Sequence, residues 1–319
     1  MNLKFAVLRL LREWFWSQEF IEVESPAIVR LPGQEPNLSP MSIILHDEKK
    51  IAQRGYLHTS PEYTMKKMLA SGWNKIFYLG KCFRDNESFG GLHNPEFTML
   101  EWYRTKADYT VIMDDVSNLC GYISERLKDY KIIRLNDFKK ISMRELWEKG
   151  VKVDLDDYLG QEEMLELCKK TGFNPETEES YEELFYRIFL NKIEPKLKNM
   201  GAVIIYEYPA KMASLSRLSK NNPNYAERFE LYINGLEIAN AFSELTDSHE
   251  QLKRLQAEQK ERARLGKEVY DIDDEFIEAV GQLPESAGIA LGVDRLVMAL
   301  MGCQEIESVI TLPASKLFN

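Results

Sequence analysis

The 319-residue sequence has few of the residues from which metal centres and disulfide frameworks are built. Its four cysteines, Cys82, Cys120, Cys168 and Cys303, are far apart, and no two of them form a CxxC pair. The four histidines are also scattered and offer no zinc-binding spacing. This pattern predicts unpaired thiols in a cytoplasmic protein and excludes a disulfide-rich secreted domain.

Long apolar runs and an excess of positive charge are missing as well. No stretch approaches the roughly 20 consecutive apolar residues of a membrane span. The N-terminal segment, MNLKFAVLRLLREWFW, carries charges within its apolar pattern and lacks a small-residue cleavage site, so it is not a signal peptide. The formal net charge of −10 provides no long-range attraction for a polyanion. We therefore expect no membrane partner and find no support for a nucleic-acid partner.

The most informative stretch consists of two strand-like runs around a glycine-containing polar segment. The runs Ile76–Phe83 and Glu96–Tyr103 predict an antiparallel hairpin with a long loop. Strict alternation in the second run places four side chains on one face, namely Phe97, Met99, Glu101 and Tyr103. A carboxylate and a phenol on the face of an aromatic side chain fit either a half-exposed sheet surface or a binding site.

The loop of this hairpin resembles a known family. The segments FRDNE, which contains Arg84, and LHNPEFTMLEWY resemble motif 2 of the class II aminoacyl-tRNA synthetases, in the form found in lysyl-tRNA synthetases and their relatives. The resemblance implies an α+β fold, the class II catalytic core, in which helices flank an antiparallel β-sheet. The loop departs from the family pattern by one additional residue between Arg84 and His93.

The same resemblance implies a site for ATP. Arg84 would hold the substrate carboxylate and the α-phosphate, because a planar guanidinium can bind two anionic groups at once. Glu87 is the expected acidic contact of ATP, with Asp85 as the alternative. The other contacts expected from motif 2 are His93, Asn94 and Phe97, whose ring would stack on adenine.

Two further motifs occur in the order expected for the class. Helical spacing of apolar residues predicts a helix over residues 2–17, and the following QEFIEVESPAIV resembles motif 1, which forms the class II dimer interface. Glu19 stands where the family usually has glycine, and packing within one chain remains the alternative to a homodimer. The segment SAGIALGVDRLVMALMG resembles motif 3, whose arginine, here Arg295, meets the γ-phosphate.

Between motifs 2 and 3, Asn234-Gly235 predicts a second hairpin. Parity puts Asn240 and Glu244 on one face of its second strand, and Glu237 can line that face only with a bulge or twist. The resemblance implies that Glu230 and Glu237 face the ATP phosphates and hold Mg²⁺. It also implies that Asn240 touches the substrate carboxylate and that Glu244 pairs with a lysine ε-ammonium.

Carboxylates predominate among the expected substrate contacts. Glu62, in the first turn of a predicted helix, and Glu101 suit an α- or β-amino group. Glu244, with the hydroxyl of Tyr103, suits a cation at the far end of the substrate. Three carboxylates indicate lysine or a lysine isomer rather than aspartate. Ala290 stands where the synthetases have glycine, and its methyl group favours β-lysine.

The resemblance covers nearly all of the chain. We expect one class II catalytic domain over residues 1–319, with a helical insertion at about 130–200 and no anticodon-binding domain. The nearest resemblance is to the truncated lysyl-tRNA synthetase paralogues that ligate lysine to elongation factor P, since Ala290 is typical of them.

This resemblance implies a function. The expected reaction is activation of lysine or β-lysine by ATP as an acyl-adenylate, followed by transfer to a lysine side chain of elongation factor P. Two alternatives remain: a minimal lysyl-tRNA synthetase-like enzyme that acts on tRNA or forms free adenylate, and a non-catalytic regulatory paralogue. The net charge disfavours tRNA. A non-catalytic paralogue should have lost Arg84, Glu230 or Arg295, and this chain retains all three.

Overall fold

The computed structural model describes residues 2–318 and is built on a mixed, mostly antiparallel sheet of eight strands. The strands, in their order across the sheet, are β1 (Ile21–Glu22), β5 (Lys75–Phe83), β6 (Glu96–Thr105), β11 (Ser286–Gly292), β10 (Leu236–Ser243), β9 (Tyr225–Ile233), β8 (Ala202–Pro209) and β7 (Phe138–Ser142). Only the outermost pairs, β1 with β5 and β7 with β8, are parallel. The α+β fold predicted from the sequence is confirmed.

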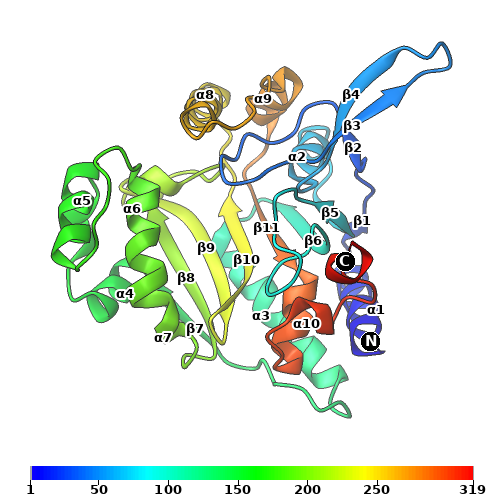
Figure 1. Cartoon of the computed structure of the whole chain (residues 1–319). Helices are drawn as coiled ribbons and strands as arrows, with labels where there is room; N and C mark the ends of the chain where they lie inside the picture. Colours follow the sequence, from blue (N-terminus) through cyan, green and yellow to red (C-terminus); the bar gives the residue numbers. More distant parts are fainter. Residues whose placement is uncertain (1, 319) are drawn as a thin grey trace.

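A second, smaller sheet extends from the body of the molecule (Figure 1). It has three strands, β2 (Ile28–Val29), β4 (Ala52–Leu57) and β3 (Ser42–His46). The hairpin of β3 and β4 projects into solvent, and several of its apolar side chains are exposed, including Ile44 and Ile51.

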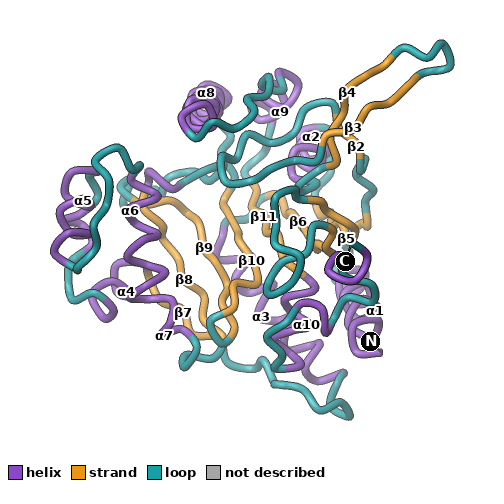
Figure 2. Tube along the Cα trace, viewed as in Figure 1, coloured by secondary structure: helices purple, strands orange, loops and turns teal. Residues whose placement is uncertain are grey.

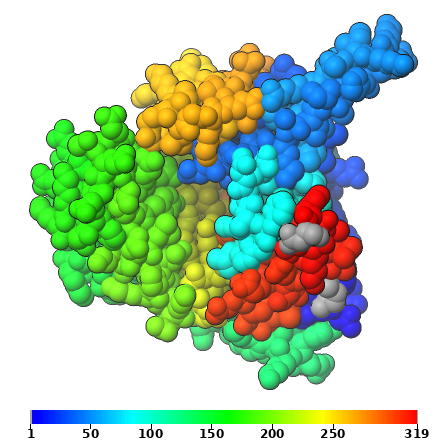
Figure 3. Space-filling model, in the orientation of Figure 1, coloured from blue at the N-terminus to red at the C-terminus, as the bar shows by residue number. Residues whose placement is uncertain are grey.

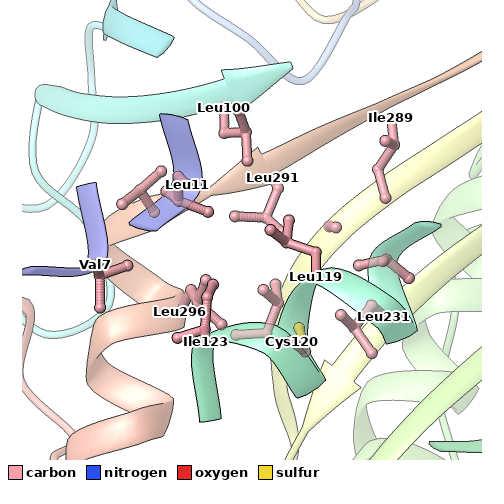
Figure 4. Close-up of a cluster of buried hydrophobic side chains, with 14 of the residues drawn as sticks. Val7, Leu11, Leu100, Leu119, Cys120, Ile123, Leu231, Ile289, Leu291 and Leu296 are labelled. Atoms are coloured by element: carbon pink, nitrogen blue, oxygen red, sulfur yellow. The ribbon is translucent and has the colours of Figure 1, made fainter. Parts of the chain in front are cut away.

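One face of the large sheet is closed by a continuous hydrophobic core (Figure 4). Three helices cover this face: α1 (Asn2–Ser17), α3 (Tyr109–Arg126) and α10 (Val293–Met301). Val7 and Leu11 of α1, one turn apart, are fully buried, as the helical spacing of the N-terminal segment predicts. In Figure 4, Leu11 lies beside Leu100 of β6 and Leu291 of β11, and Val7 lies on the side of Leu296 of α10, within the same cluster.

The opposite face is covered at its two ends (Figure 2). Beside β7 and β8 lie α4 (Met143–Gly150), α5 (Gln161–Lys170), α6 (Tyr181–Ile188) and α7 (Glu194–Leu197). Over the other end lie α2 (Glu62–Ala70) and α9 (Asp274–Gln282), next to α8 (Ser248–Arg264). The remaining short elements are η1 (Leu155–Tyr158), η2 (Phe189–Ile193), η3 (Ala210–Met212), η4 (Ile306–Ser308) and α11 (Ala314–Leu317). The centre of this face stays uncovered by helices and becomes the floor of a cavity.

Both predicted hairpins form. β5 and β6 pair from Ile76 with Tyr103 to Phe83 with Glu96. Asn234 and Gly235 join β9 to β10 with φ of 52° and 81°, the left-handed geometry that this dipeptide favours. Residues 130–200, where a helical insertion was expected, contain four α-helices and also the short strand β7, which joins this segment to the edge of the sheet.

Two further observations concern the backbone conformation of Glu19 and the length and apolarity of the helices. Glu19 has φ of 62°, a left-handed conformation that glycine adopts at less cost, which explains the preference of the family for glycine at this position. Within residues 2–318, no helix has the length and apolarity needed to cross a membrane.

Candidate active site

A cavity of about 1030 Å³ opens in the centre of the uncovered face. Figure 3 shows a hollow in this region, with strands drawn in yellow at its floor and the segment that includes α6 at its left. The strands β6, β11, β10 and β9 supply the floor, and α2, α6 and α8 contribute to the walls. Most of the site residues predicted from the sequence line it, from both hairpins and from motif 3.

Four of these residues form one row across four strands. Glu101 of β6 pairs with Ala290 of β11, Ala290 with Asn240 of β10, and Asn240 with Glu230 of β9. Paired residues on adjacent strands point to the same face of a sheet, with their β-carbons about 5 Å apart. The register therefore brings together residues that are far apart in the sequence.

A second row lies two residues further along the strands. Tyr103 pairs with Gly288, Gly288 with Phe242, and Phe242 with Arg228. A β-carbon at Gly288 would lie 2.2 Å from the ring of Tyr103, so this position must lack a side chain. The ring lies across β11 as a result, and its hydroxyl donates a 2.7 Å hydrogen bond to Glu101.

A β-bulge brings Glu237 to the cavity. The register of β10 on β9 shifts between Glu237 and Ala239, so that Glu237 lines the cavity together with Asn240 in spite of its opposite parity. The bulge that Glu237 needs in order to share a face with Asn240 is therefore present. The Glu237 carboxylate lies 3.8 Å from the guanidinium of Arg295. The Nη1 of Arg295 also donates a hydrogen bond to the backbone carbonyl oxygen of Glu237.

Arg84, at the end of β5, is placed to bind an anion. Its guanidinium lies over the ring of Phe97, with 5.0 Å between its Cζ and the ring centroid. Its Nε is buried and has no hydrogen-bond partner among residues 2–318. A buried charged donor without a partner is costly, and an anionic group bound in the cavity would satisfy it. In this arrangement the guanidinium already covers one face of Phe97, the ring expected to stack on adenine.

Residues of the motif 2 loop line the cavity or hold the loop in place. Glu87 and His93 both line the cavity, with 3.4 Å between Glu87 Oε2 and His93 Nδ1. Burial lowers the pKa of His93, so the ring is neutral near pH 7. Asn94 is instead bonded to backbone: it donates to the Glu96 carbonyl, and its oxygen accepts from the amide of Ala314. Asn94 therefore fastens the loop to the C-terminal segment, which leaves its side chain little capacity for ATP.

Three carboxylates and one ammonium group gather at the other end of the cavity. The Nζ of Lys66, one helical turn after Glu62, lies 2.7 Å from Glu62 and 2.6 Å from Glu244. Glu101 completes the group, and both Glu101 and Glu244 are 1% exposed. Glu62 and Glu101 line the cavity, whereas Glu244, which was predicted to contact the substrate, does not.

Burial governs the protonation of this cluster. It raises the pKa of Glu101 well above its usual range, and the nearby Glu62 carboxylate adds to the rise. It also raises the pKa of Glu244 to about 7, against the effect of the Lys66 ammonium. Burial alone would lower the pKa of Lys66, but the Glu244 and Glu62 carboxylates raise it, so the ammonium stays charged.

The residues predicted to hold Mg²⁺ differ in their fit. Glu237 has a half-exposed carboxylate, which suits an ion that also binds phosphate oxygens. Glu230 already accepts hydrogen bonds from Tyr208, Tyr232 and Arg228. Within residues 2–318, no cluster of three or more candidate ligands is present. Glu237 therefore fits a metal ion better than Glu230 does.

The sequence analysis missed two residues of the site. Arg228 binds both Asn240 and Glu230, at 3.1 and 2.7 Å, and so fixes two predicted contacts. Its position two residues before Glu230 on β9 was a readable signal, because both residues share a face. Lys66 was the other, and its i,i+4 spacing from Glu62 was visible in the sequence.

Comparison with known proteins agrees with the motifs. The family model described as "tRNA synthetases class II (D, K and N)" matches residues 1–316. The chain belongs to this family. The resemblance inferred from the three motifs is thereby confirmed, and membership of the class II family implies the use of ATP.

Relatives within the class II family share nearly the whole chain. The protein of Photorhabdus laumondii named elongation factor P–(R)-β-lysine ligase is 37% identical over 316 residues, which cover 98% of this chain and 94% of the relative. Proteins with the same name are 36% identical in Yersinia enterocolitica, over 98% of this chain and 94% of the relative, and 35% identical in Proteus mirabilis, over 97% and 93%.

Proposed function

We propose that this chain is an ATP-dependent, AMP-forming ligase that activates β-lysine and attaches it to a lysine side chain of elongation factor P. The row of Glu101, Ala290 and Asn240 carries the proposal, because it sets carboxylate, methyl and amide groups side by side in the cavity that Arg84 also lines. The names of the relatives support the same substrate and acceptor.

The first step forms an acyl-adenylate. A carboxylate oxygen of β-lysine attacks the α-phosphorus of ATP, and the bond to pyrophosphate breaks. Arg84 would hold the carboxylate and the α-phosphate, and Arg295 would bind the leaving pyrophosphate. The amide oxygen of Asn240 accepts from Arg228, so its NH₂ group is left to donate to the substrate carboxylate. No base is needed, because this carboxylate is already ionised.

Mg²⁺ would be held chiefly by Glu237, with Glu230 as a second contact. When bound, the ion would offset negative charge on the phosphates. Glu230 also has a role that needs no metal. It accepts a hydrogen bond from Arg228, which in turn donates to Asn240 and so orients its side chain.

The second step joins the acyl group to an amine. The nitrogen of the acceptor lysine attacks the carbonyl carbon, AMP leaves, and the amine loses a proton. Glutamates predominate in the part of the cavity bounded by α6 and α8: Glu182, Glu183, Glu250, Glu258 and Glu261. Glu183, Glu250 and Glu261 are paired with Arg254 or Arg264, and burial raises the pKa of Glu182 and Glu258. This surface therefore offers no excess of positive charge for the phosphates of tRNA, which favours a protein acceptor.

We also infer a homodimer formed through motif 1. Ile21 of β1, within the segment that resembles motif 1, is more than half exposed, and so are Phe5 and Trp16 of the preceding helix α1. Pairing of two copies would remove these apolar side chains from water.

The acceptor can be tested directly. The chain is incubated with ATP, Mg²⁺ and labelled (R)-β-lysine together with elongation factor P or tRNA. We expect label on elongation factor P that survives mild alkali, because an amide resists alkali and an aminoacyl ester does not. Elongation factor P that lacks the modified lysine is the control. Alkali-labile label found only on tRNA would instead identify a minimal synthetase, and the absence of any ATP–pyrophosphate exchange would identify a non-catalytic paralogue.

A further inference from the structure

Lys66 is a buried cation in the substrate end of the cavity that the proposed reaction does not use. It is 1% exposed and lies on α2, which covers this end of the sheet. Its ammonium bridges Glu62, on the same helix, and Glu244, which follows β10. The bridge therefore connects the helix to the sheet at the place where the substrate amino groups are expected.

The bridge leaves two carboxylate oxygens without partners. Lys66 takes one oxygen of Glu62 and Oε2 of Glu244, and Tyr103 takes Oε1 of Glu101. Among the residues that the structure describes, Glu244 Oε1 and Glu101 Oε2 are buried and have neither a hydrogen bond nor an ion pair, whereas Glu62 Oε1 and Glu244 Oε2 are paired only with the Lys66 ammonium. Orphaned buried acceptors of this kind are rare in folded proteins, and each marks a place where a donor is missing.

The number of unbalanced negative charges in the cluster equals the number of carboxylate oxygens without a partner, which is two. The cluster holds three carboxyl groups, Glu62, Glu101 and Glu244, and one ammonium, so two negative charges are unbalanced once all of the acids are ionised. Burial opposes this ionisation at Glu101 and Glu244 by raising their pKa, until further cations bind. A β-lysine molecule brings two ammonium groups. Bound there, it would neutralise the cluster and supply one donor for each orphaned oxygen, which is the condition under which buried charges are tolerated.

We propose that Lys66 is a positioning residue for the substrate: its ammonium acts as a built-in counter-ion that joins Glu62 to Glu244 and leaves the cluster two charges short, so that an amino acid with two ammonium groups is selected. The inference rests on the proposed function and deepens it. Lys66 remains in place when the substrate binds and sets both the number of charges and the position of the two carboxylates.

The titratable groups that face this cluster come from several elements, and among them Tyr63, Tyr78 and Cys82 stay neutral because burial raises their pKa. Glu62 and Lys66 come from α2, Glu101 and Tyr103 from β6, and Glu244 from the end of β10. Glu62 also faces Glu35 and Glu258, two carboxyl groups whose pKa burial raises, to about 8 for Glu258. Lys66 is the one cation that interacts with all three carboxylates of the cluster among the described residues. Without it, the acids would take up protons.

The adjacent Lys67 provides a matched control. It lies on the same helix, but its ammonium pairs with Asp273 and Glu275 of α9, and its side chain is 31% exposed. Replacement of either lysine by methionine removes one charge and keeps the length of the side chain. Lys66→Arg keeps the charge at the tested position and serves as the rescue variant.

The experiment measures binding of two probes by calorimetry between pH 6 and pH 8.5. The probes are (R)-β-lysine, which is 3,6-diaminohexanoic acid, and 3-aminohexanoic acid, which lacks the distal ammonium. For Lys66→Met we expect the preference for the first probe at pH 7 to fall at least tenfold and to recover partly at pH 8.5, because the acids must lose the protons that replaced Lys66. Measurements in buffers of different ionisation enthalpy should show more protons released on binding than for the unaltered chain.

Four outcomes are separable. If Lys66→Met and Lys67→Met keep the same preference, pH profile and proton release as the unaltered chain, Lys66 has no role in selection. A loss of thermal stability in Lys66→Met with unchanged preference would show a purely structural ion pair. An unaltered chain that binds neither probe and shows no pyrophosphate exchange would instead contradict the proposed function. Recovery of the preference in Lys66→Arg would support the counter-ion.

Discussion

The two ends of the cavity are built on opposite principles. At the substrate end the charges are buried, and the ammonium of Lys66 partly neutralises its carboxylates. At the end expected to hold the phosphates, Arg84 and Arg295 are partly exposed, and Glu237 has a side chain that is 44% exposed. The buried end is organised before any ligand binds, whereas the open end has cations that await an anion. Substrate choice should therefore depend on the first end, and transition-state stabilisation on the second.

Glu244→Gln tests the buried end and should have the largest effect. Loss of one charge from a desolvated pair should weaken β-lysine binding by about 2–5 kcal/mol and leave ATP binding nearly intact. Because the pKa of Glu244 is about 7, the KM of the unaltered chain for β-lysine should rise as the pH falls through 7, when the carboxylate takes up a proton. The glutamine variant should lose this dependence on pH.

The matched control is Glu96→Gln, which alters an exposed carboxylate on β6 that pairs with Lys81 outside the cavity. Steady-state pyrophosphate exchange measures both variants. An unchanged KM for β-lysine in Glu244→Gln would show that this carboxylate only forms an ion pair with Lys66 and does not contact the substrate.

Arg84→Ala tests the open end. Removal of the guanidinium should cost about 2–4 kcal/mol of transition-state stabilisation, because the charge that develops on the phosphates loses its donor. The effect should appear in kcat of pyrophosphate exchange, with a smaller change in the dissociation constant of β-lysine.

Arg54→Ala, which breaks an exposed ion pair with Glu268 on the projecting sheet, is the control. An equal loss in both arginine variants, or a loss confined to β-lysine affinity in Arg84→Ala, would contradict the division between the two ends.

Ala290→Gly should have the smallest effect and sharpens the account of the buried end. Ala290 lies between Glu101 and Asn240, so its methyl group adjoins the expected positions of the amino and carboxylate groups. Its loss should shift the preference from β-lysine towards α-lysine by about 1–3 kcal/mol. Ala287→Gly, on the same strand but in the core of the opposite face, controls for the glycine itself. Identical isomer ratios in all three proteins would remove Ala290 from the specificity argument.

Sequence reasoning reached the parts of the site that depend on local pattern. The period-2 alternation of β6 put Glu101 and Tyr103 on one face, and the parity of β10 required a bulge at Glu237; the structure has both. The two hairpins were predictable because each strand is adjacent to its partner along the chain.

Features that depend on contacts between distant segments could not be predicted in this way. The bridge from Lys66 to Glu244 joins residues on a helix and a strand that alternation does not relate, although the Glu62–Lys66 spacing was visible. The bonds of Asn94 to the C-terminal segment likewise depend on where Ala314 packs. β7 was hidden because it is a short edge strand within a segment of helical pattern.

The place of β11 in the sheet has a consequence for synthesis of the chain. This strand is the last to be made, yet it lies between β6 and β10 and supplies the middle of both rows of site residues. Until Ser286–Gly292 leaves the ribosome, β6 and β10 each have an unpaired edge, and such edges can pair with other chains. A nascent chain that lacks this strand thus carries two separate parts of the sheet, β1-β5-β6 and β10-β9-β8-β7, and no complete binding site. A product truncated before β11 would be prone to aggregation.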